Sequence, residues 1–145
     1  MKTHLSFVTS KLAESVDFYS ALFGEKPSKV LSDYALFITE EPGLELTLEA
    51  SSSTPQASGD HYGVFVESVD DVERAITRLQ RAGLVSAIER EETCCYANQT
   101  KVWATDPMGR RWEIYTVHED TEQRGAAGSS CCTDSLDESG VCCTA

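Results

Sequence analysis

Hydrophobic and polar positions change period along this chain, first alternating and then recurring at helical spacing. Near the N-terminus Leu5 and Phe7 alternate with polar residues, as in a half-buried strand. Residues 12–23 then place apolar side chains every three or four positions, and Gly24 follows as a helix stop. Three short strand-like segments complete this half: 28–31, 34–38 and 44–49. The pattern predicts a βαβββ module.

The second half of the chain repeats this order of elements. "HLSFVTSKLAESVDFYSALFG", starting at His4, corresponds to "HYGVFVESVDDVERAITRLQRAG", starting at His61. Ser10 and Ser68 are the predicted helix N-caps. The strand-like segments of this half are 85–90, 101–105 and 111–117. Neither module buries its sheet alone, so we expect an α+β fold in which both modules pair into one curved, mixed sheet of about eight strands.

The composition divides the chain into one domain and a tail. We predict a domain over residues 1–118, with halves at about 1–58 and 59–118. Residues 119–145 are rich in Gly, Ser and acidic residues and hold few large apolar side chains. Such a segment cannot offset the entropy lost on ordering, which predicts a flexible C-terminal tail containing cysteine pairs.

The charge excludes several classes of partner. Twelve basic and 24 acidic residues give a net charge of −12 at pH 7. This charge repels nucleic acid phosphates and anionic membrane surfaces, so neither is an expected partner. The N-terminus shows no apolar run typical of a signal peptide or a membrane span, which predicts a cytoplasmic protein with reduced cysteines.

All six cysteines stand in adjacent pairs, one of which, Cys94 and Cys95, lies inside the predicted domain. A trans peptide holds neighbouring Cα atoms about 3.8 Å apart, below the roughly 4.4–6.8 Å of a relaxed disulfide. Two free thiolates on an irregular loop form a soft chelate for Zn(II), Cd(II), Cu(I) or a trivalent metalloid. The pair therefore predicts a binding site for a thiophilic species.

Strand alternation places three metal-ligand residues on one face. In each predicted strand the apolar neighbours point toward the helices, and this leaves His4, His61 and Glu113 on the opposite, concave face. Two imidazoles and one carboxylate with open positions suit non-haem Fe(II), and Mn, Co, Ni or Zn also fit. Thr47 takes the position of Glu113 in the first module, so the repeat predicts one metal site.

The repeat, together with "DPMGRRWEIY" at the ligand strand, resembles the vicinal oxygen chelate superfamily. The segment "ETCCYANQTKVWATDPMGRRWEIYTV" further resembles the carbon–arsenic lyases. This resemblance implies that His4, His61 and Glu113 hold Fe(II) and that Cys94 and Cys95 bind arsenic. It also implies O2-dependent cleavage of trivalent organoarsenicals, such as methylarsenite and phenylarsenite, to inorganic arsenite.

Two alternatives stay open. Cysteine pairs alone are typical of a thiol-based cadmium- or arsenite-binding protein, as in the related cadmium-inducible proteins. Another dioxygenase or isomerase of the superfamily is the second alternative, although Thr47 lacks the carboxylate expected of a glyoxalase-type site. The sequence leaves open whether the modules pair within one chain or across a homodimer, and it assigns His118 no function.

Overall fold

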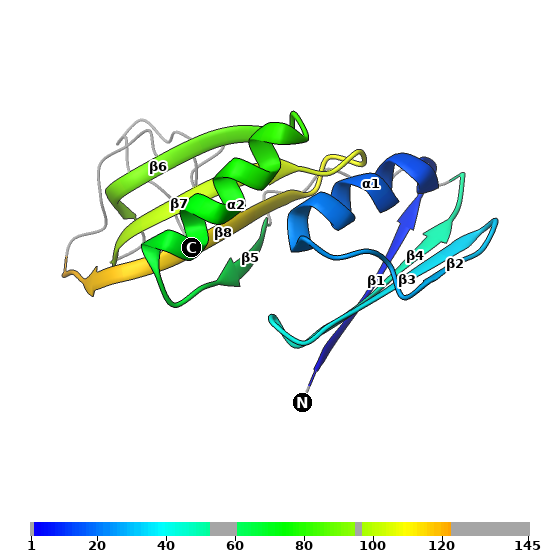
Figure 1. Cartoon of the computed structure of the whole chain (residues 1–145), viewed down its shortest axis with the longest axis horizontal. Helices are drawn as coiled ribbons and strands as arrows, with labels where there is room; N and C mark the ends of the chain where they lie inside the picture. The colour runs from blue at the N-terminus through cyan, green and yellow to red at the C-terminus, as the bar shows by residue number, and fades with distance from the viewer. Residues whose placement is uncertain (1, 53–60, 95–96, 123–145) are drawn as a thin grey trace, which may run out of the picture.

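The computed structural model describes residues 2–52, 61–94 and 97–122, which form two βαβββ modules (Figure 1). The elements of the first module are β1 (Thr3–Thr9), α1 (Leu12–Phe23), β2 (Lys29–Val30), β3 (Tyr34–Thr39) and β4 (Leu44–Ala50). Those of the second are β5 (His61–Phe65), α2 (Val69–Arg81), β6 (Val85–Cys94), β7 (Ala97–Thr105) and β8 (Arg111–Asp120). The predicted α+β class and the module repeat are confirmed.

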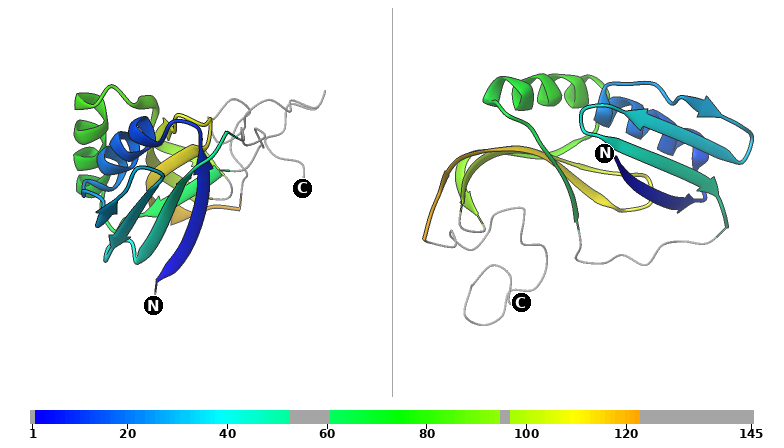
Figure 2. Two further views of the ribbon diagram at one scale, coloured as in Figure 1. Left: turned by 90° about the vertical axis from the view of Figure 1, so that its right-hand side faces the viewer. Right: turned by 90° about the horizontal axis from the view of Figure 1, so that it is seen from below.

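The eight strands divide into two four-stranded sheets, ordered β1-β4-β3-β2 and β5-β8-β7-β6. Both sheets are mixed, because β1 runs parallel to β4 and β5 parallel to β8 while the other pairs are antiparallel. The expectation of one continuous sheet is therefore wrong in this detail. Both helices lie on one side of the sheets, and the sheet of the second module curves away from α2 (Figure 2).

Side chains rather than backbone hydrogen bonds join the two modules within the chain. The rings of Phe7 on β1 and Tyr62 on β5 pack with centroids 5.2 Å apart. The Tyr19 hydroxyl of α1 donates a 2.8 Å hydrogen bond to Oδ2 of Asp106, in the turn before β8. Phe7 and Tyr19 belong to one core cluster that both modules share, and Tyr62 packs against it. The edge strands β1 and β5 are therefore connected through side chains, and they belong to separate sheets.

The alternation of faces follows the predicted pattern. Leu44, Leu46 and Leu48 of β4 are buried toward the helices, as are Trp112 and Ile114 of β8. These residues come from both modules and belong to the same core cluster. A strand period of two leaves no ambiguity once one face is apolar, which explains why the sequence pattern predicts these faces correctly.

The two helix starts differ. The Ser68 side chain accepts a hydrogen bond from the backbone N–H of Asp71, which confirms the predicted N-cap of α2. The prediction that Ser10 caps α1 is wrong, because the N-cap position is Lys11 and no side chain caps it. Thr9 takes the local hydrogen bonds instead, as its hydroxyl accepts from the N–H of Lys11 and bonds Ser15.

The last three strands are longer than the sequence pattern predicts. Cys94 pairs with Ala97, and Ala97 pairs with Asp120, so the sheet extends to the base of the cysteine segment. Strand β8 thereby runs two residues past the predicted domain boundary at 118, while residues 123–145 of the predicted tail lie outside the described residues. Neither helix in the described ranges has the length and apolar character needed to cross a membrane.

Candidate metal site and cysteine hairpin

His61 and Glu113 meet on the concave face of the second sheet. His61 opens β5 and Glu113 lies on the neighbouring parallel strand β8, with His61 Nε2 3.5 Å from Glu113 Oε1. The imidazole packs edge-on against the Trp103 ring, with centroids 5.2 Å apart. Glu113 is only 7% exposed, although it lies on the face away from the helices. A buried carboxylate beside an imidazole is a donor pair suited to a divalent metal ion.

Lys101 is a member of this site that the sequence analysis missed. Its residue is 2% exposed, and its Nζ donates a 3.0 Å hydrogen bond to Glu113 Oε2. Buried lysines are rare unless they are paired, and here the ion pair fixes one carboxylate oxygen and leaves Oε1 directed at His61. Strand alternation could have indicated this position, since Lys101 and Trp103 lie on one face of β7 and the buried Val102 lies on the other.

The separation of the two donor atoms fits a shared metal ion. Metal–ligand bonds of about 2.1 Å place neighbouring ligand atoms about 3.0–3.4 Å apart. The 3.5 Å between His61 Nε2 and Glu113 Oε1 lies close to that range. These two residues would hold the ion, and iron would supply redox chemistry that no side chain provides.

His4 does not join this pair. Its Nδ1 lies 3.5 Å from Oε1 of Glu45 on β4, and the two side chains are 56% and 45% exposed. Across the described part of the chain, no group of three or more His, Cys, Asp or Glu side chains is arranged to hold a metal. His4 shares the open side of β1 with Ser6, opposite Phe7, so its role as third ligand stays a prediction.

Strand register relates the positions of the two modules, and the single metal site stays a prediction. His61 pairs with Arg111, which stands two residues before Glu113 on β8. In the first module His4 pairs with Glu45, so the position equivalent to Glu113 is two residues after Glu45 on β4. In the first module that position is Thr47, which is buried and carries no charge. The first module therefore lacks a carboxylate at this position, and the carboxylate beside His4 belongs to its register partner Glu45.

Gly63 makes room for Glu113. The two residues are register partners, and a Cβ on Gly63 would lie 3.2 Å from Glu113 Oε1 and 3.1 Å from Cε1 of Tyr115. Such contacts are tighter than ordinary van der Waals packing. A Cβ at this position requires the Glu113 carboxylate and the Tyr115 ring to shift by a few tenths of an ångström.

Replacement of Gly63 by alanine is expected to weaken divalent-metal affinity about tenfold, because shifting a group that orients a ligand costs about 10–100-fold. Anaerobic titration with Fe(II) or Co(II) measures the change. Ser6→Ala, at the equivalent position of the first module, is the matched control and should keep the parent affinity. Equal affinities for the Gly63→Ala and parent proteins would contradict this account of the site.

The hairpin that carries the cysteine pair is bent. Cys94 is the last residue of β6, and Cys95 lies outside the described residues. Strand β6 shifts register between Glu89 and Glu92, and Glu91 has a φ of 52°. The β7–β8 pairing shifts at the same level, next to Asn98. Such bulges bend strands, and the far ends of β6 and β8 curve toward the concave side (Figure 2).

Thr100 holds this bend together. Its hydroxyl accepts from the N–H of Glu91 at 3.1 Å and bonds His118 Nε2 at 2.8 Å. His118 is the additional residue at the β8 bulge, between Val117 and Glu119 in the pairing. This structural contact is a feature that the sequence analysis did not assign.

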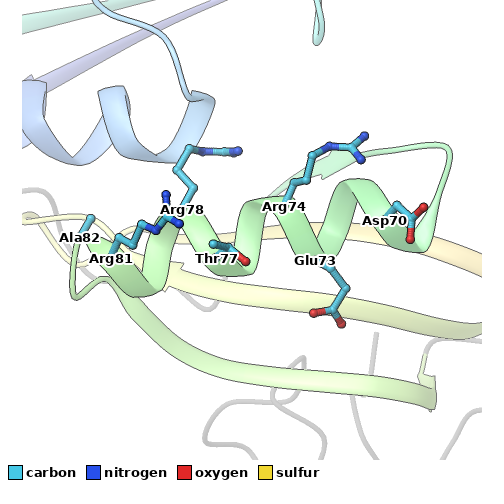
Figure 3. A pocket seen from close by; sticks show the side chains of 7 residues that line it. All are labelled: Asp70, Glu73, Arg74, Thr77, Arg78, Arg81 and Ala82. Carbon is cyan, nitrogen blue, oxygen red and sulfur yellow. The ribbon is translucent and has the colours of Figure 1, made fainter.

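A separate hollow lies along the outer side of α2 (Figure 3). Its lining residues are Asp70, Glu73, Arg74, Thr77, Arg78, Arg81 and Ala82. Arg78 already donates to the backbone carbonyls of Ala21 and Leu22, and Arg74 pairs with Asp71. The hollow is on the helix side of the fold, so it is not part of the His61–Glu113 site.

The fold, the repeat and the position of the donor pair define the class of protein. The chain belongs to the Glyoxalase/Bleomycin resistance protein/Dioxygenase superfamily, whose model matches residues 3–114. A crystal structure of a glyoxalase/bleomycin resistance protein/dioxygenase from Alicyclobacillus acidocaldarius superposes with a TM-score of 0.67 at 16% identity, covering 82% of this chain and 92% of the other.

Curated relatives are more similar in sequence. The chain is 41% identical over 133 residues to the trivalent organoarsenical cleaving enzyme of Thermomonospora curvata, covering 91% of this chain and 88% of the relative. It is 39% identical over 143 residues to the cadmium-induced protein CadI of Mycobacterium tuberculosis, covering 98% and 92%. Homologues of this chain thus include proteins named trivalent organoarsenical cleaving enzymes.

Proposed function

We propose that the protein cleaves the carbon–arsenic bond of trivalent organoarsenicals in a non-haem Fe(II)- and O2-dependent reaction that releases inorganic arsenite. The observation that carries the proposal is the contact of His61 with the buried Glu113 in a chain 41% identical to a trivalent organoarsenical cleaving enzyme. His4 is the proposed third ligand, and Fe(II) when bound supplies the activation of O2. Ni, Co, Mn and Zn, as divalent ions that also bind imidazole nitrogen and carboxylate oxygen, fit the same donors.

The remaining residues bind and orient the substrate. Trivalent arsenic in methylarsenite or phenylarsenite carries two exchangeable oxygens, which the thiolates of Cys94 and Cys95 replace. The As–C bond remains intact and is held by the bent hairpin toward the proposed ligand residues His61 and Glu113, called the metal pair below. Fixing both reactants in one chamber converts an encounter into an intramolecular step, which removes a large entropic part of the barrier.

A second candidate is a thiol-based cadmium- or arsenite-binding protein, favoured by the 39% identity to the cadmium-induced protein CadI. The buried ion pair argues against it. A thiol scavenger needs only its sulfurs, whereas Lys101 and Glu113 bury two charges at a cost that a site without metal chemistry does not require.

Anaerobically iron-loaded protein mixed with methylarsenite is expected to form inorganic arsenite only after O2 is admitted. The atoms and electrons of methylarsenite plus O2 equal those of arsenous acid plus formaldehyde, so we expect both products in equal amounts. Chromatographic arsenic speciation and a formaldehyde assay measure them. Arsenite release that persists without iron or without O2 would refute the dioxygenase assignment, and stable binding without cleavage would favour the scavenger.

A further inference from the structure

Two aromatic residues lie directly beside the metal pair. His61, Gly63 and Phe65 share one face of β5 because side chains alternate along a strand. On β8 the same face carries Glu113 and Tyr115, and Tyr115 is the register partner of Phe65. The Phe65 and Tyr115 rings pack at 70° with centroids 5.8 Å apart, within the range of favourable aromatic pairs.

Phe65 is unusually open for an aromatic residue. Its residue is 56% exposed, and among the exposed large hydrophobic residues of the described ranges it is the only one with a ring. Val117, two positions beyond Tyr115 on β8, is also exposed and extends the same apolar surface. Phe65, Tyr115 and Val117 are called the apolar platform below. One side of the Phe65 ring meets Tyr115, and solvent reaches much of the remainder.

The apolar platform borders the metal pair through Gly63. The space where a Cβ of Gly63 would stand lies 3.1 Å from Tyr115 Cε1 and 3.2 Å from Glu113 Oε1. An atom near the Glu113 oxygen is therefore also near the Tyr115 ring edge. The Glu113 oxygen and the Tyr115 ring edge thus border the same space next to Gly63.

At the end of the metal pair away from Tyr115, the same face of β8 carries Arg111, the register partner of His61. Its guanidinium lies over the Trp103 ring, 4.4 Å from the ring centroid. An apolar substituent gains nothing from this side, because it would desolvate charged groups without pairing them. The platform is the apolar border that remains.

Strand register also places the platform between the metal pair and the cysteine hairpin. Along β7 and β8, Trp103 pairs with Glu113, Lys101 with Tyr115, and Ala97 with Asp120 at the hairpin end. A substrate that reaches from the cysteine hairpin to the metal pair passes over Tyr115. The organic group of an arsenical therefore meets aromatic surface on its way to the reacting position.

We infer that the platform of Phe65, Tyr115 and Val117 binds the organic group of the arsenical and gives the site a preference for aryl over methyl substituents. This inference rests on the function proposed above, since it assigns the substrate class of the same site. A phenyl ring can lie flat on one of the two rings and edge-on to the other, whereas a methyl group covers much less of either ring.

Paired binding and turnover measurements test the inference on the full-length chain, in a background in which the four cysteines of residues 119–145 are serine so that these thiols do not bind the arsenical. Affinities for phenylarsenite and methylarsenite are measured by equilibrium dialysis on metal-free protein without O2, and turnover is measured on iron-loaded protein with a thiol reductant. Phe65→Ala is expected to lower the affinity and the kcat/KM for phenylarsenite about tenfold, and those for methylarsenite less than twofold. Phe65→Tyr keeps a ring and should retain the preference.

Val30→Ala, at another exposed apolar position on β2, is the matched control and should change neither substrate. Equal losses for both arsenicals in Phe65→Ala, or no loss for phenylarsenite, would overturn the inference. Failure of the parent protein to cleave either compound would instead reject the proposed function, and the ratio of the two binding constants would still decide the inference.

Discussion

Replacement of Glu113 by glutamine is expected to abolish stoichiometric binding of Fe(II). Glu113 supplies the one buried carboxylate next to His61, and the equivalent position of the first module is the uncharged Thr47. Loss of an outer partner of a metal ligand typically costs about 10–100-fold in affinity, so loss of the ligand itself should cost more than about 100-fold. Metal analysis after anaerobic loading and desalting measures the effect.

The same substitution also leaves Lys101 without its counterion. Removing one partner of a buried ion pair costs about 3–5 kcal/mol, so Glu113→Gln alone is expected to lower the melting temperature. The double variant Lys101→Met, Glu113→Gln replaces the pair by uncharged side chains and should regain most of the stability. It should not regain iron, and that contrast separates a ligand from a residue that only supports the fold. Retention of iron at parent affinity by the double variant would reject Glu113 as a ligand.

Sequence patterns predicted the faces of this fold because strand period and repeat phase both constrain them. Trp112 and Ile114 must face the helices, so Glu113 must face away, whatever the tertiary structure is. The repeat then relates His61 to His4 and Glu113 to Thr47, and the register of both sheets agrees with these relations.

Contacts that depend on packing between strands were not predictable in the same way. The pairing of Lys101 with Glu113 requires the β7–β8 register, which the polar residues 98–101 of β7, after the cysteines, do not specify. His4 shows the same limit, since alternation sets its face but not its neighbour, and in the structure Glu45 is the group beside it. The division into two sheets likewise depends on side chains, Phe7 and Tyr62, that fill the boundary between the modules.

The distance between the cysteine hairpin and the metal pair constrains how the two parts of the site act together. Ala97 at the hairpin end and Trp103 opposite Glu113 are six residues apart on β7, or about 20 Å along a flat strand. Thiols on a flat hairpin could not present arsenic to Glu113. The bulges at Glu91 and His118 bend β6 and β8 toward the concave side, which shortens the path from the end of β6 to Glu113 that the proposed joint action requires.

Replacement of either Cys94 or Cys95 by serine is therefore expected to abolish capture of trivalent organoarsenicals while leaving iron binding intact. The second thiolate binds an arsenic that the first already holds, and such intramolecular binding is typically worth about 10²–10⁴-fold in affinity. The measurement is made in a background in which the four cysteines of residues 119–145 are serine, so that these thiols do not mask the loss.

In that background the protein with Cys94 and Cys95 intact is the matched control, and it should bind one phenylarsenite per chain. Each single serine variant should bind phenylarsenite at least about 100-fold more weakly and lose turnover at low substrate, while anaerobic iron loading stays at the control level. The two readouts are expected to move apart because Cys94 ends β6, whereas His61 and Glu113 lie further along the same sheet. Unchanged turnover in both single variants would remove the thiols from the site, and a parallel loss of iron would assign them to the metal instead of the substrate.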